Sequence, residues 1–188
     1  PVMTDPYQLA AMEILTVLYP PAYIAKPEIV SSLILTMVNL CIDHGHSALA
    51  AFPYTLYGTI LCGVKGDIAS GYHSGMIALK LLEQFNAIQQ KAKVYVMFNA
   101  SIRIWKEPAR NTLASFLEGM KFGVEIGDIE WAIYSAKHYI ANLSFVGESL
   151  EYVEQQQAIY MQFLLTNKHE LAGLNLIAGR KAKAANTY

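Results

Sequence analysis

The residues best suited to chemistry are a carboxylate and two imidazoles within four positions, Asp43, His44 and His46. Both side-chain types bind zinc, and a histidine can also act as a general base. A complete metal site needs further ligands, and the three other histidines are scattered along the chain. At a helix end, Asp43 can simply be a polar loop residue, and the two histidines can be cations near the C-terminus of the helix. We expect no metal site, and keep a helical metal-dependent enzyme using the 43–46 cluster as an alternative.

The two cysteines, Cys41 and Cys62, lie in apolar helical runs without CxxC spacing. A nucleophilic cysteine needs a base, a residue that orients the base and an oxyanion pocket, and no such set can be inferred from the spacing. We expect both thiols to be small core residues. The chain also lacks a phosphate-binding GxxxxGK[ST] loop. The sequence therefore predicts a protein that is not an enzyme, with no catalytic residue and no cofactor.

A third group of residues combines charge with aromatic surface around one expected turn between helices. Only 15% of residues are charged, yet five polar or aromatic side chains gather here: Arg103, Trp105, Lys106, Glu107 and Arg110. They suit an internal ion-pair and cation-π clasp that sets the angle between two helices. They equally suit an interaction surface, because Trp, Tyr and Arg are enriched at binding hot spots. Five tyrosines are expected in the core or its rim, and secondarily on a peptide-binding surface: Tyr54, Tyr57, Tyr72, Tyr134 and Tyr139.

Two glycine-aspartate turns organise the helices that carry these residues. Gly66 suits the left-handed end of one helix, and Asp67 can cap the next. Gly58 precedes this turn, and Gly71 with Gly75 forms a small-residue stripe after it, which allows another helix to approach closely. The pattern returns 61 residues later (127 minus 66), an offset that is not a multiple of the 34-residue tetratricopeptide repeat. We expect turns and helix contacts at the corresponding residues Gly119, Gly127, Asp128, Ala132 and Ala136.

Helical spacing of apolar residues predicts the fold class. No segment alternates with period two for long, so we predict an all-α protein of antiparallel helical hairpins, stacked as a tetratricopeptide-like α-solenoid. Pro20 and Pro21 are expected to end the first helix, and Pro53 to delay or kink the third. Residues 1–170 are predicted as one helical-repeat domain and 171–188 as a partly frayed tail. The expected helices cover about residues 5–19, 27–44, 47–64, 67–85, 91–105, 107–126, 128–146 and 149–163, with a half-helix near 171–177.

The composition of the chain indicates which classes of partner it can bind. The net charge of −1 argues against nucleic-acid binding, which needs a basic face. The stretch between Asp43 and Lys65 is long enough to span a bilayer, but Pro53 and several polar residues favour a buried helix, so we expect no membrane insertion. No signal peptide is evident, which favours the cytoplasm. The missing initiator Met suggests a segment of a longer protein, and processing is the alternative explanation. Hydrophobic residues make up 54% of the chain, so some of this apolar surface is expected to meet a partner.

A series of short motifs, in order along the chain, carries a family resemblance. They are Pro21-Ala22-Tyr23-Ile24, Met37-Val38-Asn39-Leu40, Tyr57-Gly58, Leu61-Cys62-Gly63, Gly66-Asp67-Ile68, Gly71-Tyr72, Phe98-Asn99 with Arg103, Trp105-Lys106-Glu107, Leu117-Glu118-Gly119 and Gly127-Asp128. Through these motifs the chain resembles, from about residue 10 to about residue 160, the helical region of large bacterial multi-sensor signalling kinases. In that family, a serine/threonine kinase domain and an AAA-type, STAND-like ATPase precede this region, and GAF and histidine kinase domains often follow it.

The resemblance implies a regulatory helical-repeat segment between catalytic modules. The kinase and ATPase motifs are absent from this chain, so neither activity transfers to it. The expected role is a non-catalytic interaction module that couples or scaffolds neighbouring domains. The expected partners are flanking domains, another protein or peptide, or a second copy of the chain. A small-molecule sensor domain remains the alternative from another class, because the sequence does not separate it from protein binding.

Overall fold

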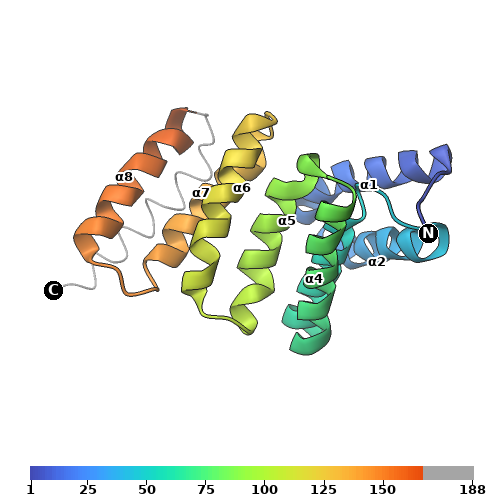
Figure 1. Cartoon of the computed structure of the whole chain (residues 1–188), viewed down its shortest axis with the longest axis horizontal. Coiled ribbons are helices and arrows are strands. Elements are labelled where there is room, and N and C mark those ends of the chain that lie inside the picture. The colour runs from blue at the N-terminus through green and yellow to red at the C-terminus, as the bar shows by residue number, and fades with distance from the viewer. Residues whose placement is uncertain (167–188) are drawn as a thin grey trace. The chain divides into compact units, whose positions relative to one another are not determined.

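The computed structural model describes residues 1–166, which form eight α-helices and no β-strand (Figure 1). The predicted all-α class is confirmed. Within these residues, one isolated bridge joins Val2 and His46. The expected half-helix near 171–177 and the tail 171–188 lie outside the described residues. The helices are α1 (Pro6–Ala25), α2 (Pro27–His44), α3 (Ala51–Ile60), α4 (Ile68–Gln84), α5 (Ile88–Ser101), α6 (Leu113–Glu125), α7 (Ile129–Leu143) and α8 (Leu150–Thr166), with a π-helix η1 (Leu61–Lys65) and the 3-10 helices η2 (Arg103–Trp105) and η3 (Ala109–Thr112).

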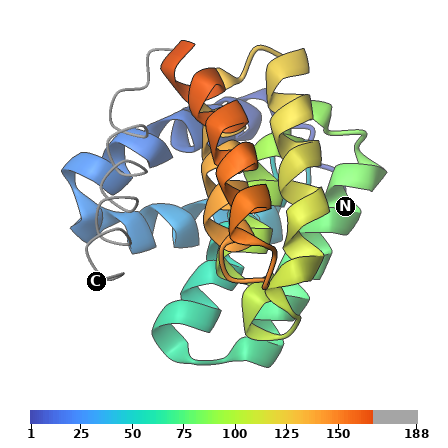
Figure 2. The ribbon, with the colours of Figure 1, turned by 90° about the vertical axis from the view of Figure 1, so that its left-hand side faces the viewer.

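The chain divides into two compact units, Pro1–Lys106 and Glu107–Tyr188, where the sequence predicted a single domain over residues 1–170. In unit 1, helix α3 packs against α2, α4 and α5, and α1 packs against α2. In unit 2, α7 packs against both α6 and α8, and α8 lies in front of α7 in the view of Figure 2. The stacking of hairpins as a tetratricopeptide-like solenoid stays a prediction.

Each unit has its own apolar core, supplied by the buried faces of its helices. The largest fully buried side chains are Met12, Met37, Phe52, Leu56, Val94, Val96 and Ile102 in unit 1, and Phe116, Ile133, Ile140 and Leu143 in unit 2. In unit 1 this packing holds α3 against α4 and α5, and so positions the groove described below.

The first helix contradicts one expectation, because Pro20 and Pro21 do not end it. Helix α1 continues through both prolines to Ala25. Proline lacks an N–H and so weakens a helix interior, which was the basis of the prediction. Here the same turn is held by packing: Tyr19 is buried and meets the ring of Phe52 edge-on, with centroids 5.4 Å apart. The packing of this turn, together with the contact of α1 with α2, therefore offsets the lost backbone hydrogen bonds.

Two other prolines act at helix starts. Pro53 is the third residue of α3, where its missing N–H would have had no intrahelical partner. The third helix thus starts late, one of the two outcomes expected. Pro108 precedes η3, and α6 begins only at Leu113, later than the sequence indicated. The fifth helix ends at Ser101, before the short turn of η2.

One buried polar group in unit 2 gives a test of the packing. Ser135 lies in α7 with no exposed surface, and its Oγ has no hydrogen-bond partner among the described residues. A buried hydroxyl without a partner costs about 1 to 3 kcal/mol. We therefore expect Ser135→Ala to raise the free energy of unfolding by about 1 kcal/mol. Urea titration of wild type and variant measures this change, and a loss of stability would show that the hydroxyl contributes a favourable contact.

Candidate functional site

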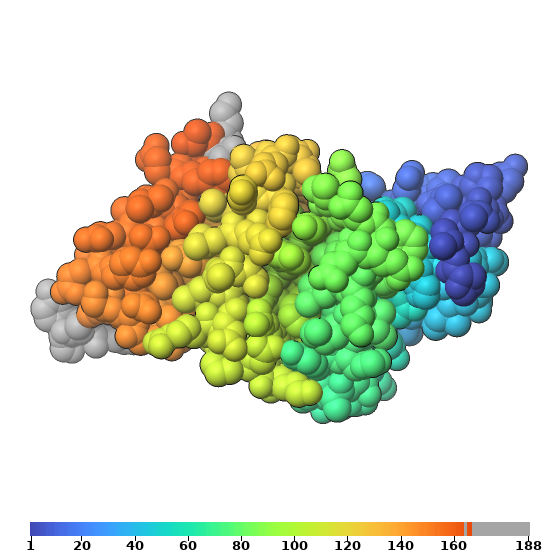
Figure 3. Space-filling model, in the orientation of Figure 1, coloured from blue at the N-terminus to red at the C-terminus, as the bar shows by residue number. Residues whose placement is uncertain are grey.

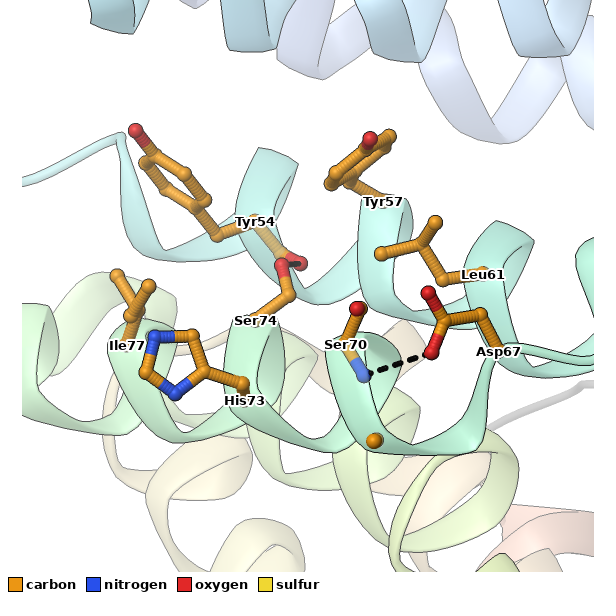
Figure 4. A pocket seen from close by; sticks show the side chains of 9 residues that line it. Tyr54, Tyr57, Leu61, Asp67, Ser70, His73, Ser74 and Ile77 are labelled. Atoms are coloured by element: carbon orange, nitrogen blue, oxygen red, sulfur yellow. Dashed lines mark hydrogen bonds between the residues drawn. The ribbon is translucent and has the colours of Figure 1, made fainter.

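Unit 1 carries an open hollow of about 570 Å³ between α3 and α4, which we call the α3–α4 groove (Figure 4). Figure 4 shows two tyrosines projecting from α3 on one side and two serines and a histidine from α4 on the other. No lining residue is Lys or Arg, and Asp67 is the only lining acid. The lining residues are Tyr54, Tyr57, Leu61, Asp67, Ala69, Ser70, His73, Ser74 and Ile77.

The α3 wall is aromatic, and contacts with His46 and Ser74 hold Tyr54 in place. Tyr54, Tyr57 and Leu61 recur every three or four residues, so they share one face of the helix. The hydroxyl of Tyr54 lies 3.0 Å from Nε2 of His46, and burial raises the pKa of Tyr54. Ser74 Oγ of α4 donates to the Tyr54 carbonyl at 2.7 Å, which ties the two helices together. The tyrosines therefore offer a preformed apolar surface with polar tips.

The α4 wall begins at the turn between the helices. Gly66 has φ 71°, the left-handed conformation that glycine adopts most readily, and ends η1. Asp67 caps α4 by accepting a hydrogen bond from the Ser70 N–H at 3.0 Å, and hydrogen bonds from Ser70 lower the pKa of Asp67. The carboxylate is exposed and charged at neutral pH, and exposed His73 follows on α4. The groove thus combines aromatic surface with one negative charge.

Glycines bring the two walls together. A Cβ on Gly58 of α3 would lie 2.7 Å from the Gly71 carbonyl oxygen of α4. A Cβ on Gly71 would collide with Sγ of Cys62 and lie 2.8 Å from the Gly58 carbonyl oxygen. A Cβ on Gly75 would lie 2.6 Å from the Phe98 ring of α5. All three distances are too short for a real side chain. The backbones of α3 and α4 therefore meet closely only because Gly58 and Gly71 are glycines, and Gly75 leaves room for the Phe98 ring of α5.

The corresponding residues of unit 2 form a similar hairpin. Gly127 has φ 76° and lies at the turn, and Asp128 is the N-cap of α7. Gly119 is buried in α6, and Ala132 and Ala136 are buried in α7. Helices α6 and α7 pack against each other along this face.

A close contact between α6 and α7 in unit 2 involves a glycine that the sequence analysis did not single out. A Cβ on Gly123 of α6 would lie 2.9 Å from Cβ of Ala132 in α7. With the 61-residue offset, Gly123 corresponds to Cys62, and Ala132 corresponds to Gly71. The same contact therefore has its glycine on the second helix in unit 1 and on the first helix in unit 2. Extending the internal alignment to every position of the hairpin would have identified Gly123.

Three residues of the charged and aromatic cluster belong to unit 1, where each contacts another group of the same unit. Arg103 Nη1 donates to Asn99 Oδ1 at 3.3 Å, and Trp105 Nε1 donates to the carbonyl four residues earlier at 3.1 Å. Lys106 Nζ lies 4.5 Å from the centroid of the Tyr72 ring. The Trp105 side chain remains exposed, with an exposed fraction of 54%. These contacts orient the side chains, and their use as an interaction surface stays a prediction.

The other two residues belong to unit 2. Glu107 Oε2 accepts a hydrogen bond from Asn111 Nδ2 at 3.1 Å. Arg110 Nη2 donates to the carbonyl of Val146 at 2.8 Å, which connects η3 to the loop after α7. The five residues of the predicted cluster are thus divided between the two units, and each contact described above lies within one unit.

The 43–46 cluster and the thiols also have defined positions. Asp43 and His44 are exposed at the end of α2, and the His46 ring pairs with Tyr54. Within residues 1–166, no three His, Cys, Asp or Glu side chains are placed to hold a metal ion. Cys41 and Cys62 are buried free thiols. Burial raises the pKa of Cys41 to about 11 and also raises the pKa of Cys62, so both are protonated at neutral pH.

None of the helices in residues 1–166 is both long and apolar enough to cross a membrane. No protein-family model, curated protein or solved structure matches the chain.

Proposed function

We propose that this chain is a non-catalytic interaction module of a signal-transduction kinase, in which the α3–α4 groove binds a peptide segment of a flanking domain or of another protein. The observation that carries the proposal is the groove itself, an open hollow lined by two tyrosines and one carboxylate, in which His46 and Ser74 hold Tyr54 in place. The signalling context comes from the family resemblance, and the binding role from the lining residues.

The lining indicates the chemistry of the peptide. Tyr54 and Tyr57 supply rigid aromatic surface at low entropic cost, which suits apolar or aromatic side chains. Asp67 offers an exposed carboxylate at one end, and no lining Lys or Arg competes for it. A segment with a Lys or Arg beside apolar residues fits this surface best.

A peptide-pool experiment tests this prediction. One labelled pool of octapeptides carries a fixed central Arg with Leu, Ile, Phe or Tyr at the flanking positions, and a second pool carries Glu instead. We expect the immobilised chain to retain more of the Arg pool, and Asp67→Asn to reduce that retention about threefold, as for an exposed ion pair. Asparagine still caps a helix, so α4 keeps its start.

The matched control is Asp128→Asn, the corresponding N-cap of unit 2, which should leave retention unchanged. Equal retention of the Arg and Glu pools, or an Asp67→Asn variant that binds like wild type, would contradict the proposed binding chemistry.

The groove volume also favours a second candidate function, a small-molecule sensor. A hollow of about 570 Å³ falls within the usual range of ligand pockets. A ligand that binds the folded state raises the melting temperature as its concentration rises. A thermal-shift screen with small aromatic amines tests this function, and a rise in melting temperature that is lost in Tyr57→Ala would place the amine in the groove.

A further inference from the structure

A second surface of unit 1 has no partner within the described chain. Six exposed residues along α1 are separated alternately by three and four positions, and we call them the α1 seam: Tyr7, Ala10, Ile14, Val17, Pro21 and Ile24. The side chains of Tyr7, Val17 and Ile24 are 83%, 75% and 76% exposed. The buried residues of α1 lie elsewhere on the helix, facing unit 1. Atoms of α1 appear at the surface of unit 1 in Figure 3, in dark blue.

The spacing of the seam indicates what covers it. An apolar residue every 3.5 positions is the pattern by which one α-helix packs lengthwise against another. The seam residues take the a and d positions of this repeat, with Tyr7, Ile14 and Pro21 seven residues apart. The middle of the seam is hollowed, with a volume of about 480 Å³ between Ile14, Val17 and their neighbours. A side chain of a second helix can enter such a hollow.

The residues that flank the seam indicate which kind of helix can pack on it. The positions that flank the seam, where coiled coils select partners by charge, hold a single charged residue, Glu13; the others are Pro6, Ala11, Leu18, Pro20 and Ala25. A surface of this kind is complementary to another uncharged apolar helix, and α1 itself meets that requirement.

We propose that a second copy of this chain covers the seam, with the two α1 helices packed antiparallel about a two-fold axis. An axis between residues 15 and 16 brings Tyr7 of one copy opposite Ile24 of the other, and Ile14 opposite Val17. In this arrangement each Glu13 lies at the edge of the seam beside Pro20 of the other copy, whereas a parallel pairing would place identical seam residues opposite each other, such as Ala10 opposite Ala10. The same patch is used by both copies, as two-fold symmetry requires.

The surface area that the seam can bury determines the expected affinity of the dimer. Its six side chains give a total buried area on the order of 1,000 Å², the lower end for specific interfaces. We therefore expect a reversible dimer with a dissociation constant in the micromolar range. This inference does not depend on the α3–α4 groove, which lies on other helices.

Sedimentation equilibrium of the full chain between about 1 and 300 μM tests the dimer. The expected result is a rise from the monomer mass of 20.9 kDa toward twice that mass. Val17→Glu should weaken association at least tenfold, because it buries two carboxylates in an apolar interface. The matched control is Val64→Glu, since Val64 is also 75% exposed but lies in η1, off the seam.

A monomer at every concentration, or equal effects of Val17→Glu and Val64→Glu, would overturn the proposal. Peptide retention by the groove is measured separately, so failure of the dimer leaves that function standing. Orientation is tested by mixing Tyr7→Cys and Ile24→Cys chains under oxidation, since the two native thiols are buried. Antiparallel packing predicts disulfide-linked heterodimers of the two variants, whereas dominant Tyr7→Cys homodimers would contradict it.

Discussion

Replacing Gly71 by alanine should lower the free energy of unfolding by about 2 kcal/mol, although alanine favours a helix interior by about 1 kcal/mol over glycine. The physical reason is the contact with α3. The new Cβ would collide with Cys62 Sγ and lie 2.8 Å from the carbonyl oxygen of Gly58. A backbone carbonyl cannot rotate away, so the helices must separate and part of the α3–α4 packing is lost.

The control is the same substitution at Gly63. This glycine lies in η1 with a negative φ, and none of the described heavy atoms lies within 4 Å of a Cβ built on it. Gly63→Ala should be neutral or slightly stabilising. Chemical denaturation followed by circular dichroism measures both changes, and equal effects at Gly63 and Gly71 would show that close helix contact is not the cause.

A double substitution tests the contact between residues 62 and 71 more directly. Cys62→Gly combined with Gly71→Ala reproduces the arrangement of unit 2, where Gly123 meets Ala132. Removing the sulfur relieves one of the two collisions, so the double variant should lose at least 1 kcal/mol less than the sum of the single variants. Strict additivity would contradict the proposed contact.

Unit 2 should lose stability as the pH falls from about 6.5 to about 4, because His138 is held neutral. Its ring stacks on Phe116 with centroids 5.6 Å apart, between α6 and α7. Burial, and secondarily the charge of Lys137, lower the pKa of His138 from 6.5 to about 4. The unfolded chain therefore binds a proton that the folded chain does not, so stability is complete above pH 6.5 and decreases toward pH 4.

The expected loss from this one group is about 3 kcal/mol, from 1.36 kcal/mol for each pKa unit. Urea titrations at pH 7 and pH 4.5 measure it, followed by the fluorescence of buried Trp131 in a Trp105→Phe background. Other groups also titrate, so the relevant quantity is the difference between wild type and His138→Gln. The variant should have lower stability at pH 7 but a weaker pH dependence.

The exposed histidine His73 provides the control, because His73→Gln should leave the pH dependence of the Trp131 signal unchanged. A His138→Gln variant with the same pH dependence as wild type would contradict the assignment to His138.

Much of the helix order could be predicted because it depends on local chemistry. Asp5 accepts a hydrogen bond from the Tyr7 N–H at 2.9 Å, Gly45 has φ 92° at the end of α2, and Ser149 accepts from the Tyr152 N–H before α8. Each signal comes from one side chain, or from the missing side chain of glycine, acting within four residues. A single sequence is sufficient to identify features of this range.

The features that could not be predicted depend on distant contacts. Helix α1 continues past Pro21 because Tyr19 packs on Phe52, more than thirty residues away. The groove was missed for the same reason: Tyr54 was expected in the core or its rim, and only the approach of α4 shows which face of α3 stays open. The α1 seam was likewise not predicted, since sequence alone does not separate a buried face from an exposed one.

The reversed glycine contact of the two hairpins has a consequence for how such a protein changes over generations. If one arrangement gives rise to the other by single substitutions, the order of the two steps matters. Placing alanine opposite Cys62 first creates a collision, whereas replacing Cys62 by glycine first leaves two glycines in contact, which costs packing but no overlap. The route through the double-glycine intermediate is therefore the more favourable one, because the opposite order passes through a hairpin destabilised by the collision.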